Sequence, residues 1–207
     1  MTGTITALTL QKRDKERVNV FLDGAYAFSL GLNAALGLKR GQYLSPADSA
    51  RLQREDEAQR AYHAALRLLG YRPRSRAEIE QRLGQKGYAA AAIAAALERL
   101  HLKQYVDDEA FARHWLDQRN RFRPRGRRAL DHELRQKGVD RDTIDRVLTE
   151  VDEAPSAWRA IEAKLHRWQG LEQTAARKKM MGFLSRRGFT YETARLVCER
   201  AIREMGL

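Results

Sequence analysis

Apolar residues recur at helical spacing through most of the chain, from Ser45 onward. One stretch follows the i, i+3, i+4, i+7 rule for a single helix face, with Ile144, Val147, Leu148 and Val151. A second stretch predicts one helix that carries a stripe of Trp158, Ile161, Leu165 and Trp168. A stripe with two tryptophans is more typical of a packed core than of a cofactor pocket. The helices that these patterns predict are short.

Glycines and capping residues mark where these helices stop and start. The predicted helices end at six glycines: Gly70, Gly87, Gly138, Gly170, Gly188 and Gly206. Asp140 and Thr190 stand at N-cap positions just after two of these stops, and Ser75 with Glu78 has the spacing of a capping box. Ser45-Pro46 supplies a cap and a proline at the first helical position.

The first 44 residues follow another pattern, with three short runs rich in β-branched and aromatic residues: ITALTLQ, RVNVFL and AYAFSL. Asp23-Gly24 lies between the last two runs and is a strong hairpin signal. We predict three antiparallel strands across Thr4–Leu30, a short helix at Leu32–Leu36 and a further segment near Gln42–Leu44. So few strands are marginally stable alone, and this small β-rich domain, residues 1–44, is therefore expected to dock on the next segment of the chain.

An internal repeat organises the helical part. LGQKGY, LRQKGV and LSRRGF begin at Leu83, Leu134 and Leu184, at offsets of 51 and then 50 residues. Each unit consists of a helix, a basic linker, a second helix that ends in Lys-Gly or Arg-Gly, and a third helix. We expect a helical connector at 45–55 and three-helix repeats at 56–106, 107–151 and 152–207. Short helices bury their faces only against neighbours, so the repeats are expected to stack into an elongated, curved body.

The sequences of these units resemble the RecX regulatory proteins. The resemblance covers Asp56 to Met205 and rests on RPRSRAEIEQRLGQKG, DDEAFARHWLDQRNRFRPRGRRALDHELRQKG and KKMMGFLSRRGF, of which the segment from Asp107 to Arg119 is the most telling. It implies a fold of tandem three-helix repeats. It also implies that the protein binds the RecA recombinase filament on single-stranded DNA and modulates it, mostly by inhibition, in DNA repair, recombination and the SOS response. Many family members start directly with the helices, so we interpret residues 1–44 as an elaboration.

Charge independently favours an anionic partner. The chain has 39 Lys and Arg against 27 Asp and Glu, a formal net charge of +12. Nucleic acid, an acidic protein face or an anionic membrane surface would suit this excess, and solubility alone is the alternative. No segment reaches the ~20 apolar residues of a membrane span, and the N-terminus lacks the pattern of a secretory signal. We therefore expect a cytoplasmic protein, and a monomer, because nothing suggests a coiled coil or an obligate interface.

Six arginines lie within the ten residues RNRFRPRGRR, Arg119 to Arg128. Three of them, Arg123, Arg125 and Arg127, repeat Arg72, Arg74 and Arg76 of the first unit, whereas Arg119, Arg121 and Arg128 have no basic counterpart there. Cations are unfavourable at a helix N-terminus, so we interpret the linkers as an anion site for phosphate or carboxylate. Internal pairing with Glu78, Glu80, Asp131 or Glu133 is the alternative. Phe122 aligns with Tyr71 and is expected to plug the space between helices rather than stack on a base.

The candidate partner- or nucleic-acid-binding residues are the cations of the linkers and of the third unit. They are Arg72, Arg74, Arg76, Arg119, Arg121, Arg123, Arg125, Arg127, Arg128, Arg177, Lys178, Lys179, Arg186 and Arg187. With the resemblance, they predict a regulator that engages RecA and single-stranded DNA, the latter directly or through the filament. The alternative is a sequence-independent nucleic-acid-binding helical repeat protein that acts without RecA.

Catalytic chemistry finds little support in the sequence. The five histidines are scattered, and neither an HExxH motif nor a glycine-rich phosphate loop occurs, so no metal or cofactor is expected. Cys198 is the only cysteine, which excludes an internal disulfide. Arg195 and Arg200 lie near it in sequence and would lower a thiol pKa, but its register beneath Leu97 and Leu148 predicts a buried position. We expect a protein without enzymatic activity.

Overall fold

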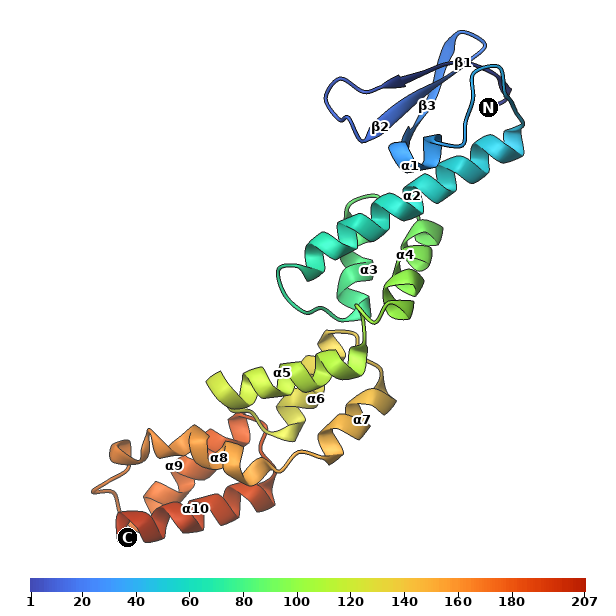
Figure 1. Cartoon of the computed structure of the whole chain (residues 1–207). Coiled ribbons are helices and arrows are strands. Elements are labelled where there is room, and N and C mark those ends of the chain that lie inside the picture. Colours follow the sequence, from blue (N-terminus) through green and yellow to red (C-terminus); the bar gives the residue numbers. More distant parts are fainter. The chain divides into compact units, whose positions relative to one another are not determined.

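The computed structural model describes the whole chain, Met1 to Leu207, which is mainly helical with a small sheet near its N-terminus (Figure 1). The chain divides into two compact units. The first holds Met1–Pro73 and Ile79–Tyr105, and the second holds Arg74–Glu78 and Val106–Leu207. The predicted fold class, tandem three-helix repeats preceded by a small antiparallel β element, is confirmed.

The sheet has four strands, β1 (Gly3–Leu10), β2 (Arg17–Leu22), β3 (Ala25–Gly31) and β4 (Tyr43–Leu44), in the order β3-β2-β1-β4. All neighbouring strands are antiparallel. The turn between β2 and β3 has positive φ at both Asp23 (48°) and Gly24 (85°), the backbone of the hairpin turn that the sequence predicts. A four-residue helix, α1 (Leu32–Ala35), follows β3.

A long helix, α2 (Pro46–Leu69), packs against the sheet. At its start the Ser45 hydroxyl accepts from the Asp48 N–H at 3.1 Å and the Asp48 carboxylate accepts from the Ser45 N–H at 3.3 Å, a reciprocal capping box. Further along α2, the buried Asp56 carboxylate accepts from the Gly31 N–H at 2.6 Å and from the Arg17 guanidinium at 3.1 Å. The sheet therefore docks on the next helix, as expected, and α2 runs without a break through the predicted boundary at 55/56.

Two further helices, α3 (Arg76–Gln85) and α4 (Ala90–Leu102), come after α2. α4 packs along α2, where small side chains on both helices are buried: Ala61, Ala64, Ala65, Ala92 and Ala96. Alanines allow the two backbones to approach closely. The first turn of α3, within Arg74–Glu78, belongs to the second compact unit, whereas its later residues belong to the first.

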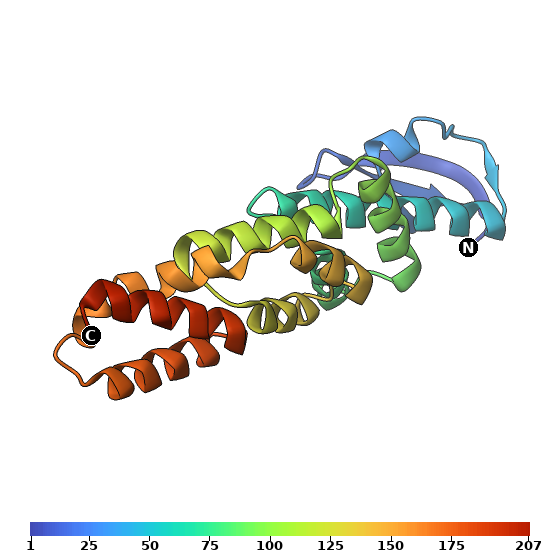
Figure 2. The same cartoon turned by 90° about the horizontal axis from the view of Figure 1, so that it is seen from below.

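The second unit contains two sets of three helices. The first set is α5 (Asp108–Phe122), α6 (Arg127–Gln136) and α7 (Arg141–Thr149), and the second is α8 (Glu153–Glu162), α9 (Gln173–Arg186) and α10 (Tyr191–Met205). α9 and α10 lie side by side (Figures 1 and 2). The first set buries Phe111, Leu116, Leu130, Leu134, Ile144 and Val147, and the second buries Trp158, Ile161, Met180, Leu184, Val197 and Ile202.

The predicted helix from Trp158 to Trp168 is wrong in its second half. α8 ends at Glu162, and Leu165–Arg167 forms a separate 3₁₀ turn, η1. The N–H of Lys164 bonds to the Ile161 carbonyl at 2.7 Å, an i to i−3 bond that tightens the backbone out of the α-helix. Trp168 still reaches the core after this turn, so the spacing of buried residues indicated burial but not an unbroken helix.

Candidate partner and nucleic-acid interface

The recurring Lys-Gly and Arg-Gly turns pack against the N-terminal ends of helices. At the end of α6, the Lys137 carbonyl accepts from the Ser75 hydroxyl at 2.5 Å. Gly138 has φ +73°, and a Cβ built there would lie 2.3 Å from the Ala77 Cβ. Glycine is required at this position both by the left-handed backbone and by the close approach to α3.

The turn after α9 repeats this arrangement against the start of α6. The Gly126 N–H donates to the Arg187 carbonyl at 3.0 Å, and the Arg128 N–H donates to the Gly188 carbonyl at 3.2 Å. A Cβ at Gly188 would lie 2.5 Å from the Ala129 nitrogen. The same motif after α3 has no such neighbour, because a Cβ at Gly87 would meet nothing within 4 Å. Two of the three motif copies are therefore junction residues.

Each of these helix N-termini also binds an internal carboxylate. The Arg76 N–H, at the start of α3, donates to the Asp108 carboxylate at 2.8 Å. The Arg127 N–H, at the start of α6, donates to Glu153, a buried residue in the first turn of α8. The predicted anion site at the start of the second helix therefore holds a carboxylate from the next helical unit. These carboxylates are not among the acids that the sequence offered as internal partners of the linkers.

Glu153 is held by several donors. Its second carboxylate oxygen accepts from the Thr190 hydroxyl at 2.8 Å and from the Thr193 hydroxyl at 3.2 Å, at the start of α10. One buried side chain thus joins the N-terminal ends of α6 and α10. A buried carboxylate without such donors would be strongly unfavourable, so these bonds are what allow its burial.

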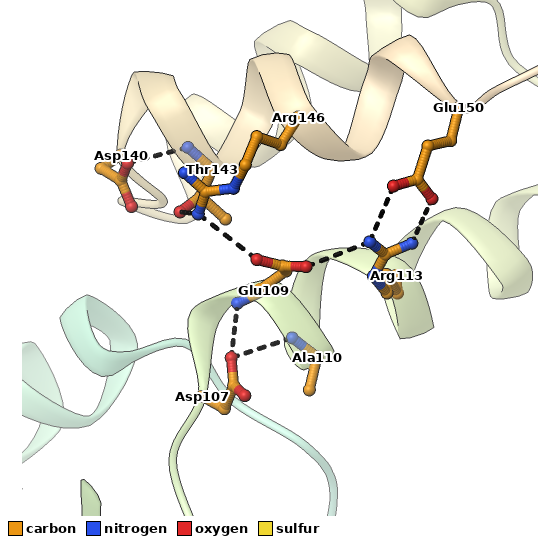
Figure 3. A network of polar contacts seen from close by, with 8 residues as sticks. All are labelled: Asp107, Glu109, Ala110, Arg113, Asp140, Thr143, Arg146 and Glu150. Carbon is orange, nitrogen blue, oxygen red and sulfur yellow. Dashed lines mark hydrogen bonds and ion pairs between the residues drawn. The ribbon is translucent and has the colours of Figure 1, made fainter.

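Asp107 and Glu109, at the start of the Asp107–Arg119 segment, have structural roles (Figure 3). Asp107 caps α5 by accepting from the Glu109 and Ala110 N–H groups at 2.8 and 3.0 Å. Glu109 pairs with Arg113 at 3.0 Å and with Arg146 of α7 at 3.3 Å. This network joins α5 to α7, so the start of the Asp107–Arg119 segment contributes to the fold.

A bidentate pair completes that network. Arg113 donates to both carboxylate oxygens of Glu150, at 2.5 and 3.0 Å (Figure 3). The hydrogen bonds from Arg113 lower the pKa of Glu150 and raise the pKa of Arg113 itself. The acids of this region are therefore occupied by cations on α5 and α7 rather than by those of the arginine-rich linker.

Two arginines of the linker run are engaged internally. Arg119 donates to Glu133 at 2.6 Å, and its guanidinium lies 4.5 Å from the centre of the Trp115 ring. The Trp115 indole N–H donates to the same carboxylate at 2.8 Å. Arg127 donates to the carbonyl of Val151. The structure thus places Arg119 and Arg127 inside the architecture of the second unit.

The remaining arginines of this run have weaker internal contacts. Arg125 lies 3.9 Å from Glu133, the carboxylate that Arg119 already engages. Arg121, Arg123 and Arg128 are exposed and form no ion pair. Arg187 donates to the Pro124 carbonyl at 3.1 Å, and burial, followed by the nearby charges of Arg125 and Arg123, lowers its pKa. We call Arg123, Arg125 and Arg187 the linker patch, since the positive charges of the first two act on the third.

The expectation that the linker aromatics are plugs is wrong. Tyr71 is 86% exposed and Phe122 is 68% exposed. The second junction closes through backbone contacts at Gly126, and at the first the Ser75 hydroxyl reaches the Lys137 carbonyl, so neither contact uses a linker aromatic. Phe122 stays at the surface, with the Arg121 guanidinium 5.7 Å from its ring centre.

The other candidate cations have different surroundings. Arg72 donates to the Pro73 carbonyl at 2.9 Å, Arg74 is half-buried, and the Arg76 side chain is exposed. Arg177 lies 3.5 Å from Glu199. Lys178, Lys179 and Arg186 line a cavity beside η1 and α9.

That cavity is also lined by residues that the sequence analysis did not connect with binding: Lys164, Arg167, Trp168 and Phe183. The runs Arg177–Lys179 and Arg186–Arg187 were its only signal in the sequence. Lys164 and Arg167 could not be assigned to it, because the break after α8 brings them there and the apolar pattern predicted an unbroken helix.

Cys198 lies in the core of the third three-helix set. Burial raises the pKa of its thiol to about 11, so the group is protonated at neutral pH and a poor nucleophile. No group of three or more His, Cys, Asp and Glu side chains is arranged to hold a metal ion. No helix has the length and apolar character needed to cross a membrane.

Four family models match the chain in order. They describe the regulatory protein RecX N-terminal domain, at residues 3–45, and the first, second and third RecX three-helix domains, at residues 61–100, 107–148 and 152–198. This chain belongs to the RecX family. The strand-rich N-terminal residues also match a RecX domain, so the similarity to the family extends beyond Asp56–Met205.

Curated relatives extend over nearly the whole chain. Regulatory protein RecX of Bacillus subtilis (strain 168) is 32% identical over 193 residues, which cover 91% of this chain and 73% of that protein. Regulatory protein RecX of Chlorobium phaeobacteroides (strain BS1) is 34% identical over 149 residues, covering 72% of this chain and 98% of that protein. Both relatives carry the RecX name, and this family is one of regulatory proteins.

Solved RecX structures share the fold. A crystal structure of regulatory protein RecX superposes with a TM-score of 0.75 at 24% identity, covering 96% of this chain and 100% of that one. RecX from Lactobacillus salivarius superposes with a TM-score of 0.66 at 19% identity, covering 71% of this chain and 97% of that one. The RecX fold therefore tolerates extensive sequence change.

Proposed function

We propose that this RecX-family chain binds the RecA–single-stranded DNA filament and modulates it, mostly by inhibiting its recombinase and ATPase activity. Membership of a regulatory family supports the proposal, and the name of that family associates it with RecA. The net charge of +12 supports an anionic partner, since such an excess attracts polyanions and acidic protein surfaces.

The linker patch is the observation that carries the proposal. Its three guanidinium groups have one carboxylate near them, Glu133 at 3.9 Å from Arg125, and Arg119 already holds that carboxylate at 2.6 Å. The exposed Arg121 and Arg128 lie close by in sequence and form no ion pair. An external phosphate or carboxylate would relieve this repulsion, and guanidinium groups bind both in a bidentate manner.

A RecA ATPase assay on single-stranded DNA tests the function. The protein is titrated at sub-stoichiometric amounts into a preformed filament, and ATP hydrolysis is followed. We expect inhibition at concentrations far below those that saturate the DNA. Inhibition that appears only near DNA saturation would instead favour a nucleic-acid-binding protein that competes for the strand and needs no RecA.

A triple variant tests Arg123 of the linker patch together with the exposed Arg121 and Arg128 beside it. Arg121→Gln, Arg123→Gln and Arg128→Gln together should raise the half-inhibitory concentration by about tenfold at low salt, and less at high salt because exposed charges are screened. Arg127 is left unchanged because it donates to the Val151 carbonyl. The control replaces Lys12, Arg13 and Lys15 with Gln, which removes the same charge from an exposed connector between β1 and β2. Equal losses in both triples would show that only net charge matters.

A further inference from the structure

A cavity of about 610 Å³ lies beside η1 and α9 in the third three-helix set. This volume falls within the ~300–1,000 Å³ that is usual for small-ligand sites. Phe183 and Trp168 form an aromatic wall, with ring centres 6.0 Å apart in an edge-on arrangement. The cavity is thus apolar on one side and is accessible from solvent.

Cations provide the rest of its polar character. The lining includes Lys164, Arg167, Lys178, Lys179 and Arg186. No acidic residue lines the cavity, and none of these five side chains forms an ion pair. Lys164 makes one weaker contact, with its Nζ 5.7 Å from the centre of the Phe183 ring. Five like charges around one hollow repel one another, so an anionic occupant would be stabilised.

Gly182 gives an independent sign that this space is kept open. It lies in the interior of α9, where glycine weakens a helix relative to alanine. A Cβ at this position would meet only the Nη1 atom of the Arg186 side chain, at 3.3 Å, so no backbone packing requires a glycine. The missing side chain instead leaves room within the cavity.

We propose that this cavity binds one nucleotide of a single-stranded nucleic acid. The base lies against Phe183, whose ring packs edge-on against the largely buried Trp168, and the phosphates on either side of the base bind Lys178, Lys179 and Arg186. This inference rests on the proposed function for its place in the RecA filament. It adds which part of the chain contacts the DNA strand directly.

The pairing of aromatic and cationic groups favours a nucleotide over other occupants. An apolar ligand would leave five cations uncompensated, and a simple anion would leave the aromatic wall exposed to water. A nucleotide places a flat base beside phosphates, so it would contact both the aromatic and the cationic side of the cavity. Single strands offer free base faces, whereas a duplex keeps its bases stacked inside, so the site is expected to prefer single strands.

Tryptophan fluorescence reads the site directly. The full chain is titrated with an oligo-dT strand of about 20 nucleotides, long enough to span a typical single-strand site, and with an abasic strand of equal length. We expect base-dependent quenching that Trp168→Phe removes and that Trp158→Phe retains, because both tryptophans lie in the same core but only Trp168 lines the cavity. Quenching that is equal for the abasic strand, or unchanged in Trp168→Phe, overturns the proposal.

Affinity measurements by fluorescence anisotropy test the two halves separately. Gly182→Leu places a good helix former in α9 but fills the cavity, and should weaken oligo-dT binding about tenfold, the loss expected for one stacked base. Replacing Lys178, Lys179 and Arg186 with Gln should lower the slope of log affinity against log salt by about 2, as expected for three phosphate contacts. The Lys12, Arg13 and Lys15 triple is the charge-matched control.

The outcomes separate this site from the proposed function. Circular dichroism checks that each variant is folded. If Gly182→Leu does not fold, the triple that replaces Lys178, Lys179 and Arg186 tests the site instead. Equal weakening by both charge triples overturns the site, as does preference for an acidic aromatic peptide over oligo-dT in the same assay. These experiments use DNA without RecA, so the two proposals can fail independently. Loss of the nucleotide site would be compatible with inhibition of the RecA ATPase, and a protein without effect on RecA could still bind a nucleotide in the cavity.

Discussion

The second unit contains two junctions built by the same motif. At the first, the Lys137-Gly138 turn packs against the first turn of α3, and at the second the Arg187-Gly188 turn packs against the first turn of α6. In both, a carboxylate from the first helix of the next three-helix unit accepts from a backbone N–H at the start of α3 or α6. The repeat therefore preserves a way of joining helices, not only their lengths.

The two junctions differ in how they treat charge. Lys137 pairs with Glu78 at 2.8 Å and lies 4.9 Å from the Trp115 ring centre, so the cation of the first turn is compensated. Arg187 has no acidic partner: it donates to the Pro124 carbonyl and lies 4.7 Å from the Phe183 ring centre, and burial together with the charges of Arg125 and Arg123 lowers its pKa. The difference shows that the number of arginines in a linker says little about binding. What distinguishes a candidate interface is a cluster of cations whose internal acids are absent or already engaged.

Removal of the junction carboxylates is expected to give the largest difference in stability between the two junctions. Glu153→Ala removes a buried acceptor that serves Arg127, Thr190 and Thr193, and should lower the free energy of unfolding by about 3–4 kcal/mol. Asp108→Ala removes one accepted bond at a half-buried position and should cost about 1 kcal/mol. Urea unfolding followed by tryptophan fluorescence measures both, since Trp115, Trp158 and Trp168 all lie in the second unit. Equal losses would mean that the two carboxylates are equivalent.

The second-largest expected loss of stability comes from the glycines of the turns. Gly188→Ala should cost about 2–3 kcal/mol, because it combines a left-handed residue with a Cβ 2.5 Å from the Ala129 nitrogen. Gly170→Ala is the matched control, with φ +79° and nothing within 4 Å of its Cβ, and should cost about 1 kcal/mol. The same unfolding experiment reports both variants. A loss at Gly188 no larger than that at Gly170 would contradict a packing role for the junction.

These glycines show what local sequence could predict. The recurring motif located the helix ends, and Asp140 and Thr190 cap α7 and α10 as expected. At α3, Ser75 accepts from the Glu78 N–H at 3.1 Å, while the Glu78 carboxylate pairs with Lys137. Capping and hydrophobic spacing are properties of a few consecutive residues, so the chain order alone reveals them.

The contacts between distant segments could not be read from the sequence in the same way. Glu153 lies 26 positions beyond the N–H that it accepts from, and nothing local marks it as a partner of Arg127. The exposure of Phe122 results from a junction closed by backbone contacts, which side-chain patterns do not encode. The cavity depends on the 3₁₀ turn at Leu165–Arg167, where the apolar spacing alone predicted a continuous helix.

The smallest expected effect concerns the pH dependence of the first junction. Burial raises the pKa of Asp108 above its ordinary value despite the hydrogen bond from Arg76, and the Asp140 carboxylate adds to the rise. The folded state therefore binds this proton more tightly than the unfolded state does. Its contribution to stability is fully present below the ordinary pKa of 3.8 and is lost as the pH rises through the raised value.

Asp108→Asn removes that titration while keeping an oxygen that can accept from the Arg76 N–H. The free energy of unfolding of the variant, minus that of the parent, should increase between pH 3 and pH 6 by less than about 1 kcal/mol, because the side chain is only half-buried. Urea unfolding at a series of pH values measures the difference. A difference that shrinks as the pH rises would show that ionised Asp108 stabilises the junction, and that its hydrogen bond outweighs the effect of burial.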